Sequence, residues 1–282
     1  MVSLSIELPE AYILAKQMTT ELTGKTVAAF TLQNCAKYQD LGFINTHLSD
    51  FQRLCNHRIE SVVSRGNTIR VKLDGTQNLL LAPEYGGTIT YHPNNAKAPS
   101  KFTLKLHFKD ETALTVTLTG MGIIQAHSDG ELENSYVYRR DFSATASPLD
   151  ANFTFARFSR DLAAKNVNLK TALVGKDATV VGLGNSAFQD IIYLAKLHPK
   201  RKASELSQAE QHSLFNAIQF MVQERIKLGG KDQFVDLYGK QGRYVAAMGP
   251  NMKGKICSSC GGAIEKLSFA GGQIYLCPRC QK

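Results

Sequence analysis

The sequence predicts an α+β fold: an antiparallel β-sandwich with a leading helix, then a helical domain with a helix-turn-helix and a four-cysteine zinc finger. Three observations predict it. Short segments of alternating apolar residues occupy the first half, helical periodicity follows Ser147 and Pro148, and two Cys-x-x-Cys pairs lie near the end. We expect domains over residues 1–147, 148–232 and 233–282.

The first half alternates apolar and polar residues with the period of a β-strand in segments 69–73, 102–108 and 114–118. Turn residues separate these segments, a pattern typical of an antiparallel sandwich. One helix should precede them. Pro9 and Glu10 suit its first turn, and its apolar face ends near Gly24.

Two helices are expected in the second half. Residues Ser207–Glu210 form a capping box that opens a long helix, which Gly229 and Gly230 end. A glycine-rich turn at 182–185 leads into the other helix, from Ser186 to about Leu197. A basic turn, 200–202, joins them as in a helix-turn-helix motif, although a plain helical hairpin with a solvated charge run would look the same.

The C-terminal segment predicts a structural zinc site. Two residues separate the cysteines of each pair, and sixteen residues separate the pairs. Within that interval, Gly271 and Gly272 are expected to form the turn of a hairpin. Disulfides or free thiols are the alternatives, and the absence of a secretion signal disfavours disulfides. Cys35 and Cys55 lie far away and are expected to be buried thiols. The expected ligands are Cys257, Cys260, Cys277 and Cys280.

The charge favours a polyanionic partner. Thirty-three Lys and Arg residues oppose 24 Asp and Glu residues, which gives a net charge of +9. An ordinary basic enzyme would satisfy the same count. No segment approaches the roughly 18 consecutive apolar residues of a membrane helix. We expect a cytoplasmic monomer that is nucleoid-associated when bound to DNA.

The order of these motifs resembles the formamidopyrimidine-DNA glycosylase and endonuclease VIII family of base-excision-repair enzymes. The resemblance runs the full length and is densest in 181–206, in the finger that ends CPRCQK, and in 7–10. It implies that damaged double-stranded DNA is bent and the damaged nucleotide rotated out. In the family an N-terminal proline amine attacks C1′ to form a Schiff base, and the adjacent glutamate transfers protons.

The resemblance carries over to the catalytic positions only in part. Glu7 stands at the proton-transferring glutamate and Glu10 at the second acidic residue of that motif. The proline position is Ile6, whose internal peptide nitrogen has no lone pair for attack. The α-amine of Val2, exposed if Met1 is removed, is an alternative nucleophile.

The positions that hold phosphates in the family are also changed in part. Asn185 matches the asparagine of the helix-two-turn-helix. Asn67 takes the place of a hairpin lysine, with Arg65 beside it, and Gln273 is the residue nearest to the finger's arginine. Further DNA contacts are expected from the basic turn, through Lys200 and Arg201.

Three functions remain open. The chain is a glycosylase with altered chemistry, in which Glu7 activates water or Val2 attacks; or it reads lesions without catalysis; or it is a general DNA-binding module. Retention of Glu7 and Glu10 favours a glycosylase with weak or lost lyase activity. The simpler interpretations are that Glu7 is an acidic residue near a helix N-terminus and that Asn185 is a helix N-cap.

Overall fold

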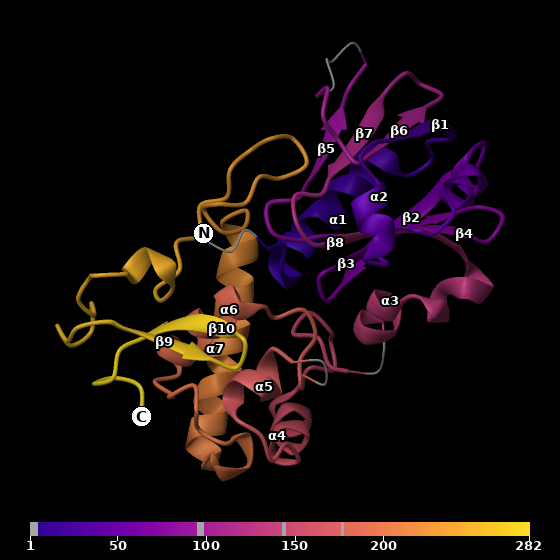
Figure 1. The fold of residues 1–282 in the computed structure, drawn as a ribbon. Helices are drawn as coiled ribbons and strands as arrows, with labels where there is room; N and C mark the ends of the chain where they lie inside the picture. Colours follow the sequence, from indigo (N-terminus) through magenta and orange to yellow (C-terminus); the bar gives the residue numbers. More distant parts are fainter. Residues whose placement is uncertain (1–4, 95–98, 143–144, 176–177) are drawn as a thin grey trace. The chain divides into compact units, whose positions relative to one another are not determined.

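A computed structural model describes residues 5–94, 99–142, 145–175 and 178–282. The chain forms two compact units, each described here by itself. The first contains residues 5–142 and 228–243, and the second contains 145–227 and 244–282 (Figure 1). The domain boundaries expected from sequence lie at 147 and 232 and divide the chain into three parts. The structure instead packs 228–243 with the first unit and the zinc finger with the helices. Within the described residues no helix is long and apolar enough to cross a membrane.

The first unit begins with α1 (Leu8–Leu22), the expected leading helix. Pro9 lies in its first turn, where its missing N–H costs no hydrogen bond. Leu14, Met18 and Leu22 recur at four-residue spacing and are fully buried, so the helix lies with one face in the core. Gly24 follows with a positive φ of 87°, which ends the helix where the sequence predicts.

Two four-stranded antiparallel sheets make up the expected sandwich. One has the order β1-β6-β7-β5 and the other β2-β3-β4-β8. The core between them contains alternate strand residues such as Val71, Leu79, Leu106 and Leu114. The strands are β1 (Val27–Leu32), β2 (Ile59–Arg65), β3 (Thr68–Leu73), β4 (Gln77–Pro83), β5 (Thr88–His92), β6 (Leu104–Phe108), β7 (Ala113–Thr117) and β8 (Gly122–Ser128).

Short helices complete the first unit. They are α2 (Ala36–Asp40), the 3-10 segments η1 (Leu48–Leu54) and η2 (Asp129–Asn134), and α3 (Tyr136–Asp141). The returning segment 228–243 has no regular helix or strand, but Phe234 and Leu237 enter the same core as the sheets. A backbone hydrogen bond of 2.9 Å from Tyr91 to the Leu237 carbonyl fixes it against β5.

The second unit is helical, with a two-stranded ribbon at its end. The capping box is present: the Ser207 amide donates to Glu210 at 2.8 Å, and the Glu210 amide donates to Ser207 at 3.3 Å. Gly229 and Gly230 follow the long helix with positive φ, as expected. The elements are α4 (Phe155–Ala163), α5 (Leu169–Leu173), α6 (Asn185–Leu194), η3 (Ala203–Glu205), α7 (Gln208–Lys227), η4 (Pro250–Met252), β9 (Glu265–Phe269) and β10 (Gly272–Leu276).

A buried polar cluster joins α6 to the chain before the ribbon. Asp190, 1% exposed, accepts hydrogen bonds from the Ala247 and Met248 amides at 2.8 and 3.2 Å and from the Tyr244 hydroxyl. Burial raises the pKa of Asp190, while these hydrogen bonds and the positive charge of Arg225 oppose the rise. Arg225 is 2% exposed, and the Asp190 carboxylate is one of the charges that act on it.

Replacing Asp190 with Ala should therefore destabilise the second unit strongly. The change leaves Arg225 buried without this carboxylate and removes the acceptor of two backbone amides, for an expected loss of about 3–5 kcal/mol. Urea unfolding followed by circular dichroism measures it. Asp161→Ala, on the half-exposed Asp161 of α4, is the control and should change stability by less than about 1 kcal/mol. Equal midpoints for the two variants would contradict the assigned role of Asp190.

Candidate functional site

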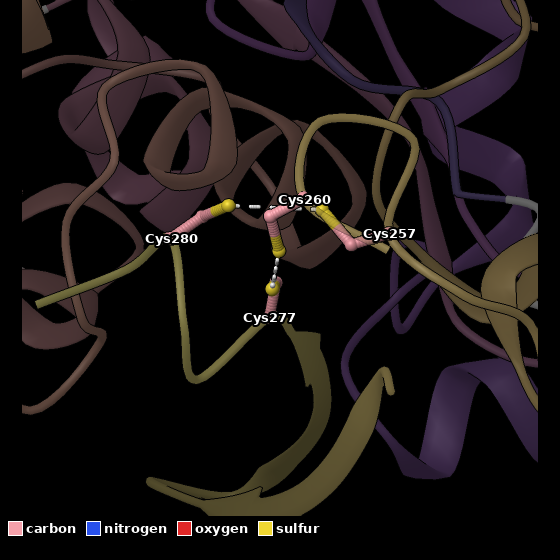
Figure 2. Close-up of side chains that lie close together, drawn as sticks. All are labelled: Cys257, Cys260, Cys277 and Cys280. Atoms are coloured by element: carbon pink, nitrogen blue, oxygen red, sulfur yellow. Dashed lines mark hydrogen bonds between the residues drawn. The ribbon is translucent and has the colours of Figure 1, made fainter. Parts of the chain in front are cut away.

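The four expected cysteines converge at one point (Figure 2). Their sulfurs all lie within 4.8 Å of one another; Cys257 and Cys280 are 3.7 Å apart, and Cys260 and Cys277 are 3.5 Å apart. A zinc–sulfur distance of about 2.3 Å would place tetrahedral ligands about 3.8 Å apart. The sulfurs therefore already have the spacing of a closed site with four cysteine ligands. These residues hold structural zinc, and Cys35 and Cys55 are not part of the group.

A hairpin of β9 and β10 lies between the two cysteine pairs in sequence, with Phe269 paired to Gly272. The turn between the strands is Ala270 and Gly271, both with positive φ. This shifts the turn by one residue from the expected Gly271 and Gly272. Gly272 is instead the first residue of β10, where the side chains of Lys170 and Asn185 lie close to it.

The catalytic candidates lie where α1 begins. Ile6 is 3% exposed and belongs to the core of the first unit, as its apolar side chain favours. Glu7 and Glu10 are buried, at 2% and 0% exposure. Val2 lies outside the described residues. Ile6 therefore packs as a core residue, which agrees with its inability to act as a nucleophile.

Glu10 holds the segment around Glu7. Its two carboxylate oxygens accept from the amides of Glu7 and Lys231, at 3.2 and 3.1 Å. The Lys231 ammonium donates to the Ser5 carbonyl, so it holds the chain on the other side of Ile6. Glu7 is the N-cap residue of α1. A helix N-terminus stabilises a carboxylate, so this simpler role coexists with any catalytic one.

Asn67, expected to contact phosphate, makes contacts within its own unit. Its amide nitrogen donates to Glu84 at 3.2 Å, and its amide oxygen accepts from the Arg140 guanidinium. Arg140 also pairs with Asp141 at 2.6 Å. The cation beside position 67 is therefore Arg140 of α3, 73 residues away in sequence. Arg65, at the end of β2, is half-buried and interacts with other residues of the protein.

Glu84 is a further carboxyl group in the neighbourhood of Glu7, besides Glu10, and sequence reasoning did not select it. Burial raises the pKa of Glu84; the charges of Asp141 and Glu7 add to the rise, and Arg140 and Asn67 oppose it. The adjacent Tyr85 is 50% exposed with φ of 51°. The sequence feature that could have identified Glu84 is its position immediately after an apolar strand.

Asn185 is the first residue of α6, and Gly184 is the N-cap, so the alternative that Asn185 caps the helix is wrong. Its side-chain nitrogen donates to the Gln273 carbonyl at 3.0 Å. Its buried side-chain oxygen has no hydrogen-bond partner among the described residues. Asn185 thus joins the start of α6 to the ribbon, while the Gln273 side chain is exposed and only its backbone takes part.

Lys170 reaches the same place and was missed by sequence reasoning. Its ammonium donates to the Phe269 carbonyl at 2.8 Å. A Cβ on Gly272 would lie 2.8 Å from that ammonium and 3.5 Å from the Asn185 side-chain oxygen. The bare backbone of Gly272 therefore admits the lysine. Its signal was a lone cation beside the buried apolar residues Leu169, Ala172 and Leu173 of helix α5.

The two basic-turn candidates differ. Arg201 is bound by Glu210 through two hydrogen bonds of 2.9 and 3.2 Å, so this guanidinium holds the turn to α7. Lys200 is exposed, and its ammonium lies 5.8 Å from the centre of the Phe269 ring. Lys200 therefore lies on the hairpin side with Lys170.

Comparison with known proteins agrees with this arrangement. Residues 6–119 match the model of the formamidopyrimidine-DNA glycosylase N-terminal domain, and 145–235 match that of its H2TH domain. Residues 254–282 match the model of the zinc finger found in FPG and IleRS. The chain belongs to the formamidopyrimidine-DNA glycosylase and endonuclease VIII family.

Curated relatives and solved structures extend over the same length. The chain is 26% identical to the formamidopyrimidine-DNA glycosylase of Heliobacterium modesticaldum, over 98% of this chain and 99% of that protein. It is 29% identical to that of Listeria innocua, over 81% and 84%. The Lactococcus lactis Fpg, solved in a complex with DNA that contains an abasic site, has the same fold, with a TM-score of 0.84, 21% identity, and coverage of 98% of this chain and 99% of that one.

The residues expected from sequence at the family's site positions have different surroundings in this structure. Ile6, expected from sequence at the proline position, is a core residue, and Asn67 is hydrogen-bonded to Glu84 and Arg140. At the finger, Gly272 and Lys170 together occupy the region assigned from sequence to an arginine. The four cysteines converge as expected, and Asn185 contacts the ribbon backbone at Gln273.

Proposed function

We propose that the chain is a DNA glycosylase of base excision repair that releases a damaged base by hydrolysis, with weak or absent strand cleavage. One observation carries the proposal. The glutamate motif is intact and buried, whereas the residue before it is an apolar core side chain on an internal peptide nitrogen. A mechanism that needs a secondary amine at position 6 is not available to such a chain. A mechanism that needs only a positioned carboxylate is available to it.

The proposed reaction uses one water molecule. Glu7 accepts a proton as the water oxygen bonds to C1′ of the sugar, and the glycosidic C1′–N bond breaks. That proton then passes to the nitrogen of the departing base, so the products are the free base and an abasic site. Glu10 positions Glu7 through the Glu7 amide and contacts no reacting atom.

Binding of damaged DNA is proposed to use the second unit's basic corner. Asn185, Lys170 and Lys200 gather where α5, α6 and the ribbon meet. The net charge of +9 favours phosphate contacts, and the solved relatives bind DNA with abasic sites or lesions. Arg201 is left out of this surface because Glu210 binds it.

A base-release assay on a panel of oxidised and ring-opened lesions tests the proposal, with borohydride trapping run in parallel. We expect free base and an intact abasic strand with little covalent adduct. Strong trapping would show an imine and would point to the Val2 amine instead. Tight binding without any base release would favour the alternative, a lesion-binding protein without catalysis.

Asn185→Ala should weaken binding to an abasic-site duplex by roughly 10- to 100-fold. A hydrogen bond to a charged group contributes about 1.5–3 kcal/mol, and this change also releases the ribbon backbone at Gln273. Fluorescence anisotropy measures the affinity, and thermal unfolding checks the fold. Asn216→Ala, on the exposed Asn216 of α7, should leave affinity unchanged. Unaltered binding by the Asn185 variant would remove this residue from the DNA surface.

A further inference from the structure

Helix α6 carries a row of polar side chains toward the zinc ribbon. The three positions, 185, 189 and 193, are spaced by four residues and therefore share one face of the helix. Each makes a hydrogen-bond-distance contact with a different part of the ribbon: Asn185 with the Gln273 carbonyl at 3.0 Å, Gln189 with the Tyr275 amide at 2.7 Å, and Tyr193 with the Cys257 sulfur at 3.3 Å.

Gln189, the middle residue of the three, contacts both the start of α6 and strand β10. Gln189 accepts from the Tyr275 amide through its side-chain oxygen, and its side-chain nitrogen donates to the Asn185 carbonyl at 3.0 Å. Gln189 is 1% exposed, so both contacts are shielded from water. The start of α6 and strand β10 are thereby fixed to each other by one amide side chain.

Tyr193 forms the contact nearest to the metal site. Its hydroxyl lies 3.3 Å from the Cys257 sulfur, 3.3 Å from the Ser258 hydroxyl and 3.0 Å from the Ser259 hydroxyl. Its ring is buried in a cluster that includes Met248, Tyr275 and Cys277. A zinc-bound sulfur is a thiolate and can only accept a hydrogen bond. With zinc bound, the Tyr193 hydroxyl therefore donates to the sulfur, and its oxygen accepts from the serines.

We propose that Tyr193 is a positioning residue of the zinc site: it donates a hydrogen bond to the Cys257 thiolate and, through α6, couples zinc retention to the position of Asn185. Partners of this kind orient a metal ligand and stabilise its charged form. Without zinc, the Cys257 sulfur is no longer fixed in position beside the Tyr193 hydroxyl. The ribbon then loses one end of its attachment to the helix that presents Asn185. The DNA part of the inference rests on the proposed function, whereas the zinc part does not.

Tyr193→Phe tests the zinc part, because phenylalanine keeps the buried ring and removes only the hydroxyl. Competition with a chelating dye should show zinc bound about 10- to 100-fold more weakly. In the cobalt-substituted protein, the thiolate-to-metal charge-transfer band should move to longer wavelength, since a thiolate without a hydrogen bond donates electrons more readily. Tyr275→Phe is the matched control. It removes a hydroxyl from the same cluster, and no hydrogen bond joins that hydroxyl to a cysteine in the described chain.

Affinity for an abasic-site duplex, measured along the same chelator titration, tests the coupling. In Tyr193→Phe, DNA affinity should fall at a roughly 10- to 100-fold lower chelator concentration than in the wild type and recover with added zinc. Wild-type zinc affinity together with an unmoved cobalt band would overturn the proposal. Zinc loss without a parallel loss of DNA affinity would overturn the coupling. If the wild type binds no abasic DNA even with zinc, the proposed function fails and the zinc result stands.

Discussion

Cys277→Ser is expected to abolish zinc binding and unfold the ribbon, residues 254–282. Cys277 is fully buried at the end of β10, and its amide donates to the Gln281 side chain at 2.9 Å. Structural zinc contributes about 10–16 kcal/mol of apparent binding free energy in small finger peptides, far more than the few apolar side chains of a ribbon. Elemental analysis should fall from about one zinc per chain to none. Limited proteolysis should then cut the ribbon first.

The second expected consequence is weaker DNA binding, because the ribbon carbonyls of Phe269 and Gln273 hold Lys170 and Asn185. Cys55→Ser is the control, since Cys55 lies in the first unit and outside the four-cysteine group. It should keep both zinc and DNA affinity. Full zinc occupancy in Cys277→Ser would contradict the assigned ligand set.

Features with a local cause were predictable from sequence. The cysteine spacing brings four sulfurs together because each knuckle and the hairpin are formed by neighbouring residues. The capping box at Ser207 and Glu210 spans three residues, and the strand alternation in 69–73 has a period of two. Such signals do not depend on where the rest of the chain folds. The order of the motifs gave the family, which the matching of domain models confirms.

Residues that act through distant partners were not predictable in this way. Arg140 reaches Asn67 across 73 positions, and Lys170 reaches Phe269 across 99. Neither cation stands in a motif. The loss of a lysine at position 67 and of an arginine near Gln273 was visible from sequence, but the cations beside those positions emerge only from the fold. The apolar spacing along α7 predicts that Ile226 faces inward, but Ile226 is only partly buried, and Arg225 beside it is the more deeply buried.

Glu7→Gln is expected to abolish base release while leaving lesion binding nearly intact. The amide has the size of the carboxylate but cannot accept the proton of the attacking water, so a loss of about 10²- to 10⁴-fold in single-turnover base release follows. Folding should be preserved, because Glu10 holds position 7 through the backbone amide, which the substitution leaves in place. Base release is measured on the best substrate of the lesion panel, and anisotropy on the same duplex gives the affinity.

Glu133→Gln, the same change at an exposed residue of η2, controls for a general effect of removing one negative charge. It should release base at the wild-type rate. If Glu7→Gln also does so, Glu7 serves only as the helix N-cap, and the neighbouring half-buried Glu84 becomes the carboxyl group to test. If Glu7→Gln instead loses both base release and DNA affinity while its melting temperature stays unchanged, the carboxylate contributes to binding the lesion itself. Only retained affinity with lost base release assigns Glu7 to proton transfer.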